Sequence, residues 1–113
     1  MKLLVFICNN PDLVEEVLEG YLEIGITGGT VLDSLGMGHL LATEVPIFAG
    51  FQTLFSAATT SNRTIVSVIK DDDKVTEAMD MIEEVCGQLS EPGVGIAFTV
   101  NLDEVRGLMP ELD

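Results

Sequence analysis

Gly25-Ile26-Thr27-Gly28-Gly29-Thr30-Val31 joins two patterns of different period in this chain of 113 residues. Before it, apolar side chains recur at helical spacing from Val14 to Leu22, and after it a strand-like run extends from Thr30 to Leu35. Gly25 is suited to end the helix, because glycine adopts the left-handed conformation of a helix C-terminus without steric cost. Gly36-Met37-Gly38 then ends the strand. The stretch therefore predicts a helix, a glycine-rich connection and a strand.

The first half of the chain reads as a strand followed by an amphipathic helix. Leu3 to Cys8 is a short apolar run of the kind that forms a central strand. Asn10 is expected to cap the next helix, and Pro11 fits its first turn. The apolar stripe of this helix consists of Val14, Val17, Leu18, Tyr21 and Leu22, whereas glutamates occupy its other side.

The second half repeats the order of the first. Thr64 to Ile69 is rich in β-branched residues and predicts a strand. Asp71-Asp72-Asp73 places acid at the start of a helix that runs to about Leu89, where negative charge is favoured by the helix dipole. Its apolar stripe is Val75, Met79, Ile82, Cys86 and Leu89. Ile96 to Val100 is the last predicted strand.

The order βαβ–βαβ predicts one α+β domain over residues 1–113 with a ferredoxin-like fold. In that fold two helices lie on one face of a four-stranded antiparallel sheet. Each helix carries a single apolar stripe, so the helices cover only one sheet face. The strands are apolar on their other face as well, which predicts that this face is buried between subunits of an oligomer.

The net charge of −14, with only five basic residues, excludes binding to nucleic acid, which depends on Lys and Arg at phosphates. An anionic membrane would also repel the chain. The excess of acid has two interpretations: solubility alone, or binding of cations or of a basic protein. No apolar run reaches the ~20 residues that a membrane-spanning helix needs. Met1 to Cys8 reads as a strand and not as a signal peptide, which predicts a cytoplasmic protein with Cys8 and Cys86 reduced.

The glycine segments at both ends of the chain resemble those of the PII signalling proteins, trimeric sensors of nitrogen and energy status. In that family a nucleotide lies in the cleft between neighbouring subunits, flanked by such glycines, with a threonine near the base. The resemblance implies a small-molecule site, and Arg106 is the one basic side chain near its residues in the sequence. The predicted site residues are Gly28, Thr30, Gly36, Met37, Gly38, Gly93, Val94, Gly95 and Arg106. The resemblance also implies a homotrimer.

The phosphate-binding side chains of the family do not match this chain. Where PII proteins have a glutamine, a lysine and two arginines, an ungapped comparison finds Leu40, Ile96, Gly107 and Met109. Each charge-assisted contact contributes on the order of 1.5–3 kcal/mol, so their loss removes most of the attraction for a triphosphate. We therefore expect ATP to bind weakly or not at all, and a less charged nucleotide or a neutral metabolite stays open. The residues do not identify a cofactor.

The middle segment, residues 39–62, departs most from the family. It has about the length of the PII loop that contacts partner proteins, but it is apolar. Phe48, Phe51 and Phe55 are spaced by three and four residues, which predicts a short helix from about Ile47 to Ala58. Such a helix either packs on its own trimer or forms a docking surface for a regulated partner protein.

Little in the sequence favours catalysis. His39 is the only histidine, and no nucleophile–base arrangement or metal-ligand spacing is visible. We expect a PII-like sensor that binds a small molecule in the intersubunit cleft and regulates a partner protein. The alternatives are a divalent-cation-binding trimer similar to CutA, using His39 with carboxylates, and a structural trimer without a ligand.

Overall fold

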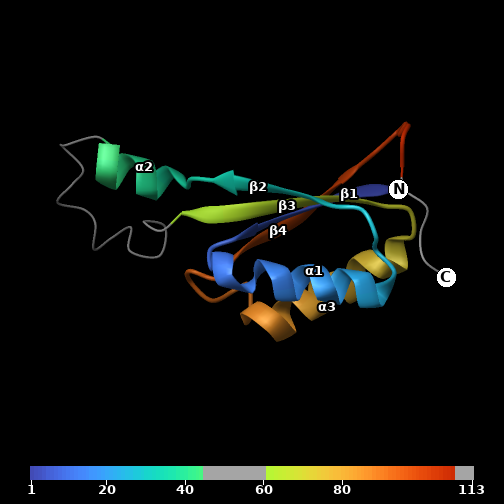
Figure 1. Cartoon of the computed structure of the whole chain (residues 1–113), viewed down its shortest axis with the longest axis horizontal. Helices are drawn as coiled ribbons and strands as arrows, with labels where there is room; N and C mark the ends of the chain where they lie inside the picture. The colour runs from blue at the N-terminus through green and yellow to red at the C-terminus, as the bar shows by residue number, and fades with distance from the viewer. Residues whose placement is uncertain (45–60, 109–113) are drawn as a thin grey trace.

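The computed structural model describes residues 1–44 and 61–108 (Figure 1). The helix predicted for residues 47–58 lies outside them, as does Met109. In chain order the elements are β1 (Lys2–Cys8), a 3-10 helix η1 (Pro11–Leu13), α1 (Val14–Ile24), β2 (Thr30–Ser34), α2 (Met37–Glu44), β3 (Asn62–Ile69), α3 (Asp72–Cys86) and β4 (Gly95–Asn101).

The four strands form one antiparallel sheet in the order β2-β3-β1-β4. The two central strands pair along their whole length, from Lys2 opposite Ile69 to Cys8 opposite Arg63. β4 lies on the other side of β1, and the shorter β2 lies on the other side of β3. This α+β arrangement confirms the predicted ferredoxin-like fold.

The helices α1 and α3 pack side by side on one face of the sheet (Figure 1). Alternate residues of the strands point into this layer, because successive side chains of a strand face opposite sides. The buried core comprises Leu4, Phe6, Cys8, Val14, Val17, Tyr21, Ile26, Ile65, Ile69, Ala78 and Ile82. Leu22, the last residue of the apolar stripe predicted for the first helix, is 54% exposed. It extends the stripe beyond the width that α3 and the sheet cover.

Local capping explains where the helices begin and end. The side chain of Asn10 accepts a hydrogen bond from the backbone N–H of Asp12 at 3.2 Å, as the sequence predicts. Asp71 caps α3 in the same way through the N–H of Asp73 at 3.0 Å. Gly25 ends α1 with φ of 98°, in the left-handed region. α3 ends at Cys86, before the predicted Leu89, because Gly87 leaves helical geometry with φ of 101° and ψ of 171°.

The segment after β2 differs from the prediction. The strand ends at Ser34 and not at Leu35, and Met37 begins a helix, α2, that was not predicted from the sequence. Gly36 accepts a hydrogen bond from the backbone N–H of Leu40 at 3.1 Å, so it takes part in the first turn of this helix. Figure 1 shows α2 extending from the end of β2, away from the layer of α1 and α3.

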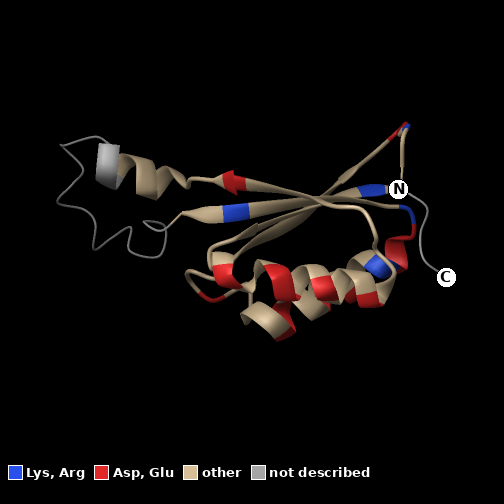
Figure 2. Cartoon of the chain, in the orientation of Figure 1, with Lys and Arg blue, Asp and Glu red and all other residues tan. Residues whose placement is uncertain are grey.

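The face of the sheet opposite the helices, called the open face here, is apolar. Its residues include Leu3, Val5 and Ile7 of β1, which pair with Val100, Phe98 and Ile96 of β4. The β4 side chains are 41–55% exposed, as is Leu32 at 49%. Acidic residues, in contrast, gather along α1 and α3 on the other side of the sheet (Figure 2). Large exposed apolar areas are uncommon on soluble monomers, and those that occur are often interaction sites.

Within the described ranges, the search for helices long and apolar enough to cross a membrane found none.

Candidate functional site

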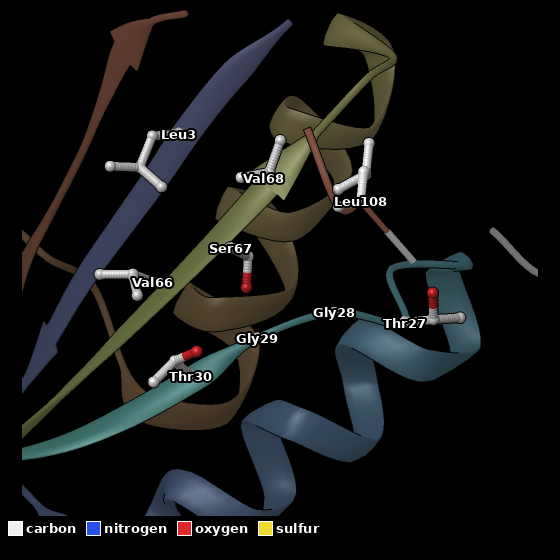
Figure 3. Close-up of a pocket in the computed structure, with 10 residues that line it drawn as sticks. Leu3, Thr27, Gly28, Gly29, Thr30, Val66, Ser67, Val68 and Leu108 are labelled. Atoms are coloured by element: carbon white, nitrogen blue, oxygen red, sulfur yellow. The ribbon is translucent and has the colours of Figure 1, made fainter. Parts of the chain in front are cut away.

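A pocket of about 390 Å³ lies where β2 begins beside β3 (Figure 3). Four separate parts of the chain line it: Leu3 of β1, Thr27–Thr30 before and at the start of β2, Val66–Val68 of β3, and Gly107–Leu108. Its volume falls within the range of small-molecule sites, roughly 300–1,000 Å³. It includes Gly28 and Thr30, two of the residues predicted for the site.

The part of β3 beside this pocket has no ladder partner on the side of β2 among the described strands, and it is called the free β3 edge. β2 pairs with β3 from Ser34 opposite Asn62 only as far as Thr30 opposite Val66, whereas β3 continues to Ile69. Along the described strands, the edge beyond Val66 therefore has no ladder partner on the β2 side. Such an edge offers alternating N–H donors and C=O acceptors, which a flat ligand with its own donors and acceptors can bind.

The lining of the pocket carries no charged side chain among its ten residues. Gly107, which stands where the resemblance places an arginine of the family, is one of them. Arg106 precedes it, but its side chain is 89% exposed and its Nη2 atom lies 3.0 Å from Oε1 of Glu104. The pocket therefore suits an uncharged ligand. Its walls are apolar, and its polar groups are hydroxyls and backbone N–H and C=O groups.

Gly29 and Ser67 lie in close contact in the lining of this pocket. Gly29 lies against β3 so closely that a Cβ atom there would be 3.0 Å from Oγ of Ser67, whereas a Cβ on Gly28 would meet nothing within 4 Å. Ser67 is 2% exposed, and its hydroxyl has no hydrogen-bond partner among the described residues. Figure 3 shows the Ser67 hydroxyl directed toward Gly29.

The other predicted glycine segments lie at the opposite end of the sheet. Gly95 pairs with Cys8 at the end of β1, and Val94 accepts a hydrogen bond from the N–H of Asn9 at 3.2 Å. Gly36, Met37 and Gly38 follow β2 at this end too, but from the opposite edge strand. Edge strands β2 and β4 are separated by three strand spacings, roughly 14 Å. Within one chain, the predicted site residues therefore form separate groups.

A second pocket, of about 330 Å³, lies beside Leu35, at the end of β2 away from the first. It contains an ion pair, in which Nε of Arg63 lies 3.3 Å from Oδ1 of Asp33. The hydroxyl of Ser34 is bonded there to Asn62 and lies 2.9 Å from that of Thr64. The hydroxyl of Ser34 is thus satisfied, whereas Nε of Arg63 makes no hydrogen bond among the described residues. Because its lining carries both charges of the ion pair, this pocket is a weaker candidate than the first for an uncharged ligand.

The structure also shows where the single histidine and the two cysteines lie. His39 lies in α2. Within the described ranges, the search for three or more His, Cys, Asp or Glu residues placed to hold a metal ion found none. Cys8 and Cys86 are free thiols close to one another. Burial of the Cys86 thiol, and to a smaller extent the neighbouring Cys8, raises the pKa of Cys86 to about 12.

Sequence reasoning missed most of the pocket lining, namely Leu3, Thr27, Gly29, Val66, Ser67, Val68 and Leu108. Ser67 left one signal, because a serine stands at a core-facing position between Ile65 and Ile69 in a strand of alternating burial. The remaining residues have no individual signal. They become a lining because β2 is shorter than β3 and because Gly107 and Leu108, after β4, reach the same pocket.

A comparison with protein-family models matches residues 1–111 to the nitrogen regulatory protein P-II family. This chain belongs to the P-II family. A search of curated proteins found no match. Membership agrees with the resemblance of the glycine segments and makes the chain a PII-like regulatory signalling protein. As a P-II protein, it carries its pocket next to the glycine segment that begins β2.

Proposed function

We propose that this P-II protein is a sensor that binds a small uncharged ligand, of the adenine-nucleoside type, and regulates a partner protein in response. The observation that carries the proposal is the first pocket, which combines a free β3 edge with a lining without charge. A purine base has donors and acceptors along one edge and an apolar face, so it suits both. A triphosphate would find no cation among these lining residues.

The proposal includes a homotrimer formed through the open face. Leu32, Phe98 and Val100 are each at least 41% exposed there, and no described helix covers them. Burial of apolar surface contributes about 25 cal/mol per Å², which favours association of this face with other copies of the chain. The arrangement of the site residues supports the same conclusion. Gly93–Gly95 and Thr30 lie apart in one chain, and a neighbouring copy brings such groups into one intersubunit cleft.

Three finer points complete the proposal. The whole of residues 1–113 is one domain that works in the cytoplasm by binding and not by catalysis. The regulated partner contacts residues 39–62, of which only 39–44 and 61–62 belong to the described part of the chain. Ligand in the cleft alters this segment through α2, which begins three residues after β2 ends.

Titration calorimetry with adenosine and with ATP tests the ligand class. We expect adenosine to bind and ATP to bind no more tightly than adenosine, since the phosphates gain no charge-assisted contact and meet a protein of net charge −14. Binding of ATP at least tenfold tighter than adenosine would contradict the uncharged-ligand proposal. Absence of binding for both would contradict the sensor proposal for this ligand class.

A further inference from the structure

Among the described residues, the hydroxyl of Ser67 makes no contact that would explain its presence in the core. Ser67 stands in β3 between Ile65 and Ile69, both fully buried, and faces the same layer as they do. Its Oγ is buried without a hydrogen-bond partner in that part of the chain. A buried hydroxyl without a partner destabilises the folded state, and alanine or valine would suit this position better for folding alone.

Ser34 shows what a structural serine looks like in the same sheet. Its hydroxyl bonds to the side chain of Asn62 and lies 2.9 Å from Oγ1 of Thr64. The two serines thus differ in one respect that matters: the hydroxyl of Ser34 is satisfied within the protein, and that of Ser67 is not. An unsatisfied buried polar group in a native protein calls for an explanation beyond folding.

The position of Ser67 supplies that explanation. It lines the first pocket beside the free β3 edge, and its hydroxyl is directed toward Gly29 (Figure 3). Gly29 lies directly over the hydroxyl and covers it with backbone atoms only. A Cβ atom there would be 3.0 Å from Oγ, which leaves little room for a side chain. Two consecutive glycines, Gly28 and Gly29, leave this cover without side chains. Contact between the hydroxyl and a ligand in the pocket requires this cover to shift outward.

We propose that Ser67 is a specificity-determining residue of the pocket, whose hydroxyl hydrogen-bonds a ring nitrogen or amino group of an uncharged nucleoside. The inference rests on the proposed function and deepens it. The free β3 edge and the apolar walls bind any flat heterocycle of suitable size. The hydroxyl adds one contact that a ligand without a matching polar atom would leave unsatisfied, and such mismatches discriminate strongly between ligands.

The test compares Ser67→Ala and Gly29→Ala with wild type, using adenosine as the probe in titration calorimetry and melting curves of the free proteins at one concentration. We expect Ser67→Ala to weaken adenosine binding about tenfold, the loss of a hydrogen bond at the strong end of the neutral range. The same variant should melt about 4 °C higher when free, since it removes an unsatisfied buried group. Gly29→Ala should also weaken binding, because its Cβ crowds the hydroxyl.

Ser34→Ala is the matched control, as it removes a satisfied hydroxyl from the same sheet outside the pocket. It should melt lower than wild type and bind adenosine within about twofold of wild type. Equal adenosine affinity of Ser67→Ala and wild type would overturn the inference and leave the proposed function standing. A lower melting temperature of free Ser67→Ala would overturn it as well, since the hydroxyl would then be structural. If wild type does not bind adenosine, the inference and the proposed ligand class fall together.

Discussion

Gly95 leaves no room for a side chain beside Ile7. The two residues lie next to each other at the end of the β1–β4 pair, where Ile7 pairs with Ile96 and Cys8 pairs with Gly95. A Cβ atom on Gly95 would overlap the carbonyl oxygen of Ile7 and would be 3.2 Å from a ring carbon of Phe6. Gly95 also has φ of 148°, a conformation that other residues rarely adopt. The packing of the sheet therefore requires glycine here before any ligand is considered.

Gly95→Ala should destabilise the protein by about 2–5 kcal/mol, the sum of backbone strain and of overpacking against β1. Urea unfolding of the variant and of wild type measures the difference. Gly28→Ala is the stability control, because a Cβ there meets nothing within 4 Å and the residue has no positive φ. Equal loss of stability in the two variants would show that the contact with Ile7 does not decide the effect.

Phe98→Glu should separate the proposed trimer into monomers. Phe98 is 41% exposed in the middle of the open face, opposite Val5, and a buried carboxylate without a partner is costly. Light scattering should give three times the 12.1 kDa chain mass for wild type and one chain mass for the variant. Glu77→Gln, an exposed change in α3, should leave the trimer intact. Wild type of single-chain mass at micromolar concentration would refute the trimer.

Ile96→Lys should raise the affinity for ATP, because the resemblance places the family's phosphate-binding lysine at this position, which is 55% exposed near the start of β4. One charge-assisted contact to a phosphate is expected to increase affinity about tenfold or more. The gain should be absent for adenosine, which has no phosphate, and absent in Ile96→Gln, which adds no charge. Calorimetry with both ligands measures it. An unchanged ATP affinity would show that the nucleotide phosphates lie away from residue 96.

Stability should fall in alkaline solution through Cys86. Burial, and then the nearby Cys8, raises the pKa of the Cys86 thiol in the folded protein to about 12, against 9.0 for an ordinary thiol. The folded state therefore favours the neutral thiol. This contribution is fully present below about pH 9 and is lost as the pH rises from 9 toward 12.

Urea unfolding at pH 8 and at pH 10.5 checks this prediction against Cys86→Ala as the control. The free energy of unfolding should decrease more between the two pH values for wild type than for the variant. Groups away from Cys86 titrate alike in both proteins, so the difference reports the thiol together with Tyr21, whose pKa is raised by burial and also by the neighbouring Cys86. Parallel decreases would mean that Cys86 ionises in the folded protein as readily as in the unfolded chain.

The local elements of this protein could be read from the sequence. The cap at Asn10, the acid at the start of α3 and the left-handed Gly25 each depend on residues within one helical turn. The alternation and spacing of apolar residues likewise predicted four strands and two helices, because side-chain direction follows the backbone period. From these, the βαβ–βαβ order and the ferredoxin-like sheet followed. α2 was missed, since Gly36-Met37-Gly38 also suits a turn and the helix has no strong amphipathic pattern.

The first pocket, in contrast, exists only in the tertiary structure. It joins Leu3, Thr27–Thr30, Val66–Val68 and Gly107–Leu108, and no local pattern relates segments so far apart in the chain. Gly28 and Thr30 were predicted as site residues by family resemblance, but their partner across the pocket, Ser67, was not. The sequence alone determined which faces of the helices and strands are apolar. Sheet register and strand length decided which polar groups remain unpaired, because hydrogen bonds in a sheet join residues according to their alignment in space and not their distance along the chain.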